Sequence, residues 1–201
     1  MRPFLLALAL SSIVGAAAAD DSPFTLHKQS RRSTAANPAK FETVATEARW
    51  EPSKTALIVC DVWDDHWCRG ASRRVGELAP FLNRVIAEAR AKGVLIVHSP
   101  SGCMDFYKDH PARLRAKNAP KAADLPKDVG SWCYKIPAEE RGTYPIDQSD
   151  GGCDCGPRCK ERNAWTRQNP AIEIRDEDAI SDSGVEVWNL LAARGIEHIL
   201  M

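Results

Sequence analysis

The residue whose type and position best suit chemistry is an aspartate at the end of an apolar run. Residues 55–60 read Thr-Ala-Leu-Ile-Val-Cys, and Asp61 follows directly. Burial disfavours the charged form of a carboxylate, so an acid in that place lowers stability unless it is hydrogen-bonded, and its presence can mark a functional role. Two interpretations stay open on this pattern alone. Asp61 is a functional acid or base, or it caps the following turn by accepting hydrogen bonds from nearby backbone N–H groups.

Cysteines form a second chemical feature, and seven of them lie at positions 60, 68, 103, 133, 153, 155 and 159. In an oxidising compartment such a number predicts disulfides and at least one free thiol. Cys133 together with the last three offers four thiolates for zinc. The single residue between Cys153 and Cys155 departs, however, from the usual ligand spacing of about two to four residues. We therefore favour disulfides that cross-link this loop.

The first residues predict export. Met1-Arg2 gives a positive start, residues 4–14 are almost all apolar, and Ala17 to Ala19 are small. This is the layout of a secretory signal peptide over residues 1–19, cleaved before Asp20. The apolar run is shorter than the roughly 20 residues of a spanning helix. We expect a periplasmic or extracellular protein that does not remain in the membrane.

Charge separates two classes of partner. Lys and Arg total 27, Asp and Glu total 27, and the formal net charge is +0 at pH 7. Nucleic-acid binding needs a concentrated basic surface that neutralises phosphates, so we expect no nucleic-acid partner. The expected partner is a small-molecule substrate, and a homo-oligomer is left open.

The elements that must hold Asp61 follow from apolar periodicity. Residues 55–62 and 94–98 are short continuous apolar runs, which are typical of strands buried on both faces of a parallel sheet. Between them, an apolar stripe over residues 75–89 predicts an amphipathic helix that ends at Lys92-Gly93. Together they form a βαβ unit with His98 at the end of its second strand.

A second unit follows a long irregular segment. Residues 103–170 show little periodicity beyond a short helix over residues 111–117, and a loop of this length is usually functional or cross-linked. Residues 171–174 predict a strand, Ser181 or Ser183 begins a helix that ends at Arg194-Gly195, and residues 196–201 begin another strand.

The predicted fold class is therefore α/β, an open parallel sheet with helices on both faces in a Rossmann-like three-layer arrangement. This domain spans residues 41–201, and its residues 41–50 form an edge strand or hairpin arm. Residues 20–40 are polar and aperiodic, and we expect a flexible lead-in. In such sheets ligands bind at the carboxyl ends of the strands, where Asp61 and His98 lie.

The stretch around Asp61 resembles a known signature. Residues 57–66 read Leu-Ile-Val-Cys-Asp-Val-Trp-Asp-Asp-His and are similar to the first strand of the isochorismatase-like cysteine hydrolases, which include nicotinamidases. In that family the strand ends in a pattern close to Asp-Val-Gln-Asn-Asp-Phe. Asp61, Val62 and Asp65 match it. Residues 190–201 are similar to the helix and strand before the family's nucleophile, whereas residues 103–170 match poorly.

The resemblance implies a hydrolase with an Asp–Lys–Cys triad that cleaves a C–N bond of a small amide-like substrate. Asp61 takes the position of the acid, and Arg175 lies at or near that of the lysine. The family's cysteine follows the last strand after a Gly-Val-x-Thr-like turn, beyond Met201. A thiolate is the reactive form of cysteine and needs a nearby base or cation. His66 and His98 are the expected substrate-binding residues.

Two further expectations concern metals and the other class of function. Some nicotinamidases bind a metal through an Asp-x-His pair, but that spacing is absent after His98, so we expect no metal and no cofactor. Trp63 and Trp67 suit a planar or amide-bearing ligand, although packing beneath the long loop is the commoner role of such residues. The alternative function is a non-catalytic secreted binding domain that keeps the fold without the triad.

Overall fold

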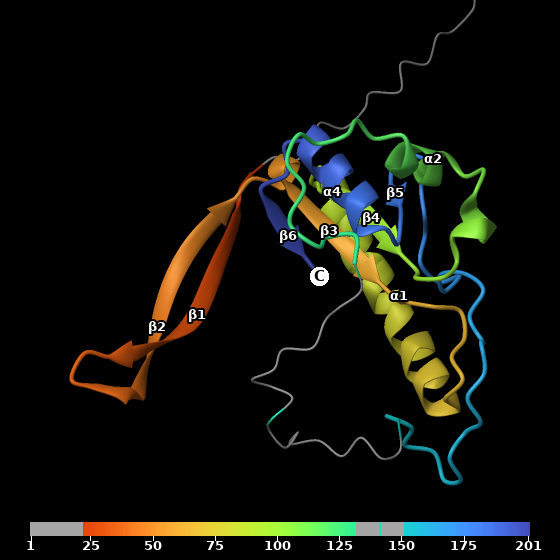
Figure 1. The fold of residues 1–201 in the computed structure, drawn as a ribbon, viewed down its shortest axis with the longest axis horizontal. Coiled ribbons are helices and arrows are strands. Elements are labelled where there is room, and N and C mark those ends of the chain that lie inside the picture. The colour runs from red at the N-terminus through yellow and green to blue at the C-terminus, as the bar shows by residue number, and fades with distance from the viewer. Residues whose placement is uncertain (1–21, 132–140, 142–150) are drawn as a thin grey trace, which may run out of the picture.

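The computed structural model shows a four-stranded parallel sheet at the centre of the protein and a separate antiparallel hairpin (Figure 1). The structure describes residues 22–131, 141 and 151–201, and three α-helices lie within them. The predicted signal peptide, residues 1–19, and Cys133 lie outside the described residues. Within the described part of the chain, no helix is long and apolar enough to cross a membrane.

The sheet has the strand order β5-β4-β3-β6, and all neighbouring strands run parallel. Its members are β3 (Thr55–Cys60), β4 (Leu95–Ser99), β5 (Ala179–Ile180) and β6 (His198–Leu200). β3 pairs with β4 along its length as far as Cys60↔Ser99, but with β6 only as far as Leu57↔Leu200. The predicted open parallel sheet is confirmed, and Asp61 follows the end of its β3 strand.

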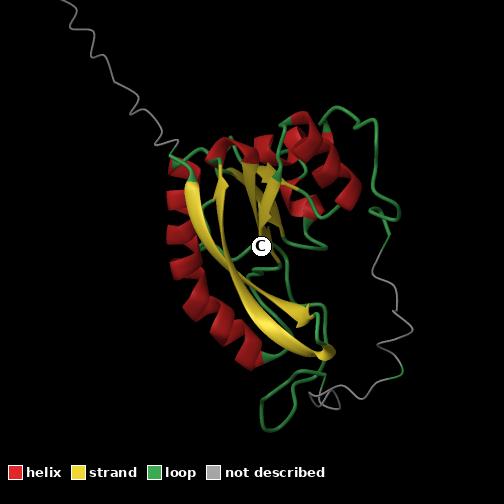
Figure 2. Ribbon diagram, turned by 90° about the vertical axis from the view of Figure 1, so that its left-hand side faces the viewer, coloured by secondary structure: helices red, strands yellow, loops and turns green. Residues whose placement is uncertain are grey.

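Helices cover both faces of the sheet (Figure 2). α1 (Arg69–Ala91) lies on one face, and α2 (Pro111–Lys117) and α4 (Gly184–Ala193) lie on the other. Because successive strand residues point to opposite sides, Val59 and Ile96 join the cluster under α1, and Ile58 and Val97 join the cluster under α2 and α4. Ser183, one of the two serines predicted to begin this helix, caps α4 by accepting the Glu186 N–H.

The hairpin differs from the expectation for the lead-in. β1 (Phe24–Thr34) and β2 (Asn37–Trp50) form an antiparallel ribbon that extends from the sheet (Figure 1). The hairpin arm predicted at residues 41–50 is confirmed, but residues 24–34 and 37–40 are strand rather than irregular lead-in. Most side chains of the ribbon are exposed and none is buried. Strong apolar alternation therefore does not mark these strands, and backbone pairing defines them instead.

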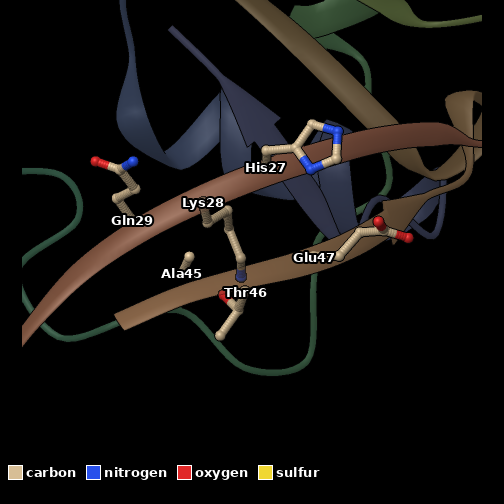
Figure 3. A pocket seen from close by; sticks show the side chains of 6 residues that line it. All are labelled: His27, Lys28, Gln29, Ala45, Thr46 and Glu47. Carbon is tan, nitrogen blue, oxygen red and sulfur yellow. The ribbon is translucent and has the colours of Figure 1, made fainter. Parts of the chain in front are cut away.

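Two aromatic side chains join the hairpin to the body. The Trp50 ring stacks on the His198 ring of β6, with centroids 4.4 Å apart and an interplanar angle of 8°, and Phe24 packs against the core under α1. A hollow along the ribbon is lined only by side chains of β1 and β2 (Figure 3): His27, Lys28, Gln29, Ala45, Thr46 and Glu47. It contains no residue from the parallel sheet, so it is separate from the carboxyl ends of the strands.

The strand predicted at residues 171–174 is wrong. Ile172 and Ile174 pack into the apolar clusters from a loop, and β5, the strand beside β4, begins only at Ala179. The apolar run at residues 171–174 therefore misplaces the strand. The residue that leads into β5, Asp178, is only 2% exposed although it is polar, so no apolar run marks the true strand. The described residues also form two short 3₁₀ helices: η1 (Pro52–Lys54) leads into β3, and η2 (Met104–Tyr107) precedes α2.

Candidate functional site at the carboxyl ends of β3 and β4

Asp61 is exposed and is held in a defined position. Its backbone has a positive φ of 49°, a conformation that few side chains other than Asn and Asp adopt readily. Its N–H donates to the Ser99 carbonyl at 3.1 Å, and its Oδ1 accepts the Ser101 N–H at 3.0 Å. The carboxylate therefore caps the turn after β4 rather than its own turn. Its Oδ2 has no hydrogen-bond partner among the described residues, and the residue is exposed.

The loop after β3 is bound to a distant part of the chain. The Val62 carbonyl accepts the Asn169 N–H at 2.7 Å, and the Asp64 N–H donates to the Arg167 carbonyl at 3.0 Å. The Asp64 carboxylate accepts the Thr166 N–H at 2.9 Å and the Thr166 hydroxyl at 2.6 Å. Partial burial opposes ionisation of Asp64, but these hydrogen bonds outweigh it, so the pKa of Asp64 is lowered.

An aromatic cluster lies on this loop. The Trp63 and Trp165 rings stack with centroids 4.3 Å apart and an interplanar angle of 11°. The His66 ring is nearly parallel to them, with its centroid 5.8 Å from that of Trp165 and 6.3 Å from that of Trp63. The Trp63 Nε1–H donates to the Ser101 carbonyl at 3.2 Å. Because Asp61 accepts the N–H of the same residue, the aromatic cluster and the carboxylate share one anchor.

His66 is also fixed by its own loop. Its Nδ1 accepts the Cys68 N–H at 3.1 Å, so the neutral ring carries its proton on Nε2. Its neighbour Asp65 accepts the Ser72 hydroxyl at 2.7 Å and pairs with Arg162 at 2.6 Å. Hydrogen bonds from Arg162 and then Ser72 lower the pKa of Asp65. The structure thus places His66, as predicted, at the same edge of the sheet as Asp61.

The two described thiols near Asp61 are poor nucleophiles. Cys103 is 3% exposed, and burial raises the pKa of its thiol to about 11, with further contributions from the charges of Asp64, Asp182 and Asp61. Burial and the Asp61 charge also raise the pKa of Cys60. A thiol in this condition stays protonated near neutral pH. Neither residue provides an activated thiolate.

His98 does not line a cleft. Its ring has no exposed surface, its Nδ1 lies 2.8 Å from the Gln168 amide nitrogen, and its Nε2 lies 3.1 Å from Asp178 Oδ2. The Gln168 N–H in turn donates to the Tyr107 hydroxyl at 3.0 Å. Protein groups occupy both ring nitrogens, so His98 is a buried member of a polar network rather than a ligand contact. The prediction rested on its place at a strand end, which does not reveal the direction of the side chain.

Arg175 lies near the amino ends of the strands, whereas Asp61 lies at their carboxyl ends. Arg175 is in the loop before β5, where its N–H donates to Asp178 Oδ2 at 2.8 Å. Its exposed guanidinium pairs with Glu173 at 3.0 Å, and these contacts raise the pKa of Arg175. The structure therefore does not bring Arg175 to Asp61. Two arginines contact the loop after β3 instead: Arg162 pairs with Asp65, and the Arg167 Nε lies 3.9 Å from Asp64 Oδ2.

A cluster of four cysteines lies beside this edge. The Sγ atoms of Cys68, Cys153, Cys155 and Cys159 all lie within 4.8 Å of one another. No two described cysteines are bonded, so the predicted disulfides among residues 153, 155 and 159 are not formed. Cys68 is the member that the sequence did not reveal, because it is separated from the other three by a long stretch of chain. The one sequence feature that could have pointed to Cys68 is its position directly before the first helix.

No protein-family model, curated protein or solved structure matches this chain. The resemblance to the isochorismatase-like hydrolases therefore rests on the residues quoted above. The described site combines a solvent-facing carboxylate, stacked aromatic rings and a nearby arginine at the carboxyl edge of a parallel sheet. Such a site can bind a planar polar molecule and accept a proton from it or from a nucleophile.

Proposed function

We propose that the protein is a hydrolase of the isochorismatase-like type that cleaves a C–N bond of a small amide-like substrate, with Asp61 as the base. The observation that carries the proposal is the position of Asp61. It directly follows a central strand, its side chain is exposed, and one carboxylate oxygen accepts the N–H of Ser101, whose carbonyl accepts the Trp63 Nε1–H. Ligands of open α/β sheets bind at this edge.

The reaction needs a thiol beside Asp61. In the family resemblance it comes from the segment after the last strand, here β6. Leu200 pairs with Leu57, and Asp61 lies four residues beyond Leu57. Chain that continued β6 in the same register would therefore reach Asp61 four residues after Leu200. Among the described residues, none pairs with β3 beyond Leu57 on the β6 side, and an apolar hollow there is lined by Cys60, Val62 and Met201 among others.

The chemistry follows from these positions. Asp61 takes the proton of the thiol, and the thiolate attacks the carbonyl carbon of the amide. The proton then passes from Asp61 to the leaving nitrogen as the C–N bond breaks, and water, deprotonated by Asp61, releases the acid and restores the thiol. Stacking between the aromatic cluster and a planar amide would orient the substrate. The cationic role that the resemblance gives to lysine falls to Arg167, which can orient an acid but cannot exchange protons.

A non-catalytic binding domain is the second candidate. It is favoured by the raised pKa values of Cys60 and Cys103, which leave Asp61 without a reactive thiol among the described residues. In that case the aromatic cluster and Asp61 bind a planar polar ligand without turning it over.

The test compares two versions of the chain, residues 20–201 and a version that includes the residues encoded downstream. Both are assayed for ammonia release from a panel of small amides that includes nicotinamide. We expect turnover by the longer version alone, and its loss in Asp61→Asn, with Asp105→Asn, an exposed acid in η2, as the matched control. Turnover by the shorter version would contradict the proposed source of the thiol, and its loss in Cys103→Ala would identify Cys103 as the nucleophile. Saturable binding without turnover in either version would favour the binding domain.

A further inference from the structure

We propose that Cys68, Cys153, Cys155 and Cys159 form a closed tetrahedral zinc site that joins the long loop to the start of α1. This site is separate from the proposed hydrolysis and does not depend on it. Three of the four side chains are buried and the fourth is half-buried, and Trp67 and Ala71 pack around them. A set of four thiolates around a buried point is the ligand arrangement that structural zinc sites use.

The spacing of the sulfur atoms fits a metal better than disulfides. With Zn–S bonds of about 2.3 Å, a regular tetrahedron places its sulfur atoms about 3.8 Å apart. The Sγ atoms of Cys68 and Cys155 are 3.9 Å apart, and all four lie within 4.8 Å of one another. A disulfide requires about 2.05 Å and joins atoms in pairs. Two disulfides would give two short contacts, whereas the structure has four mutually close atoms.

Backbone N–H groups point at the sulfur atoms. The Gly70 N–H donates to Cys155 Sγ at 3.3 Å, and the Arg69 N–H donates to Cys159 Sγ at 3.5 Å. The Cys159 N–H donates to Cys153 Sγ at 3.5 Å. Two of these donors are the first residues of α1, where the unpaired N–H groups and the helix dipole stabilise negative charge. Such donors are the outer contacts that hold metal-bound thiolates in place.

Four thiolates this close together would repel one another. A divalent cation removes this repulsion and lets all four ligands ionise.

The site would fix the loop that carries half of the candidate functional site. Arg74 of α1 pairs with Asp154 between two of the ligands at 2.5 Å, and Trp165 and Thr166 follow the last ligand in the same loop. These residues form the stack with Trp63 and the hydrogen bonds to Asp64. Zinc therefore has a positional role. All four ligands come from protein, which leaves no open position for substrate.

The test measures zinc in the full-length chain, purified without chelators, and in two cysteine variants. We expect one zinc per chain in the wild type, near-complete loss in Cys68→Ser, and full retention in Cys60→Ser, a matched change outside the cluster. Removal of zinc by a strong chelator should lower Tm by on the order of 10 °C, with recovery on adding zinc back. Absence of zinc with four thiols missing from a denaturing titration would establish two disulfides and overturn the proposal. Absence of zinc with every thiol titratable would overturn it as well.

A second measurement does not depend on the folding of a variant. Cobalt is exchanged into the wild-type chain, and its visible spectrum is recorded. Intense bands of tetrahedral cobalt with thiolate charge transfer are expected. Weak octahedral bands, or bands that persist unchanged after all thiols are alkylated, would show that the cysteines are not the ligands.

Discussion

Asp178 and Asp61 both adjoin strands of the parallel sheet, but their surroundings are opposite. Asp178, before β5, is 2% exposed and accepts hydrogen bonds from Arg90, His98 and the Arg175 N–H at 2.7–3.1 Å. Asp61, after β3, is exposed and accepts one described hydrogen bond, from Ser101. The charge of Asp178 is thus matched within the protein, whereas Asp61 has no described cationic partner. Two acids that adjoin strands of one sheet are therefore a buried member of an ion-pair network in one case and an exposed side chain in the other.

The largest effect on stability is expected from Asp178→Ala. Removal of this carboxylate leaves the Arg90 guanidinium, whose side chain is 8% exposed, without its buried counter-ion. Breaking a buried pair in this way costs about 3–5 kcal/mol of unfolding free energy. Urea denaturation at pH 7 measures it, with the exposed Glu177→Ala as control. A loss below about 1 kcal/mol would mean that the network contributes little and that the contrast with Asp61 is false.

Acid should weaken the same network. Burial alone would raise the pKa of Asp178, but the hydrogen bonds from His98 and Arg90 outweigh it and hold that pKa well below its usual value. The folded pKa is therefore below the unfolded value of about 3.9, so the stabilisation is complete above that pH and is lost as pH falls through the folded pKa. We expect a loss on the order of 1–3 kcal/mol below about pH 4. The decline should be shallower in Asp178→Asn, and equal slopes would contradict the assignment to Asp178.

A smaller effect is expected from Trp165→Leu, which removes one ring of the aromatic cluster but keeps an apolar side chain. The stack with Trp63 is worth about 0.5–1.5 kcal/mol beyond area burial, and Trp165 is only half-buried. Urea denaturation measures the stability. Ligand binding, followed by titration with the best amide of the panel, should weaken more than stability does. Unchanged ligand affinity would place the aromatic cluster outside the binding site.

The main elements could be predicted from the sequence because their patterns are local. β3, β4 and α4 follow from apolar runs and capping residues that lie within a few positions of one another. β5 and the first hairpin strand could not be predicted this way. β5 is two residues long beside a buried acid, and its surroundings depend on Arg90 from a distant helix. β1 has no buried side chain, so it leaves no clear hydrophobic pattern.

The candidate site was predictable only in part, for a related reason. Asp61 and His66 belong to one short stretch, whereas the partners that define their surroundings come from residues 162–169. Sequence spacing does not show that Cys68 meets Cys153 to Cys159, or that His98 points into a network with Gln168. Side-chain direction and long-range proximity depend on tertiary packing, which one sequence does not reveal.

The smallest effect on stability is expected from Asp61→Asn, and it gives the sharpest contrast with Asp178. Asparagine adopts a positive φ about as readily as aspartate, and its amide oxygen can still accept the Ser101 N–H. The unfolding free energy should therefore stay within about 0.5 kcal/mol of the wild type. Asp61→Ala loses the hydrogen bond and places a Cβ-bearing residue without a polar side chain at φ 49°, so it should cost roughly 1–2 kcal/mol more.

Urea denaturation of both variants at pH 7, beside the amide assay, separates the two roles: Asp61→Asn should fold normally and be inactive. A loss of stability from Asp61→Asn as large as that from Asp178→Ala would show that Asp61 is a structural residue, and the proposal of a base at this edge would fail.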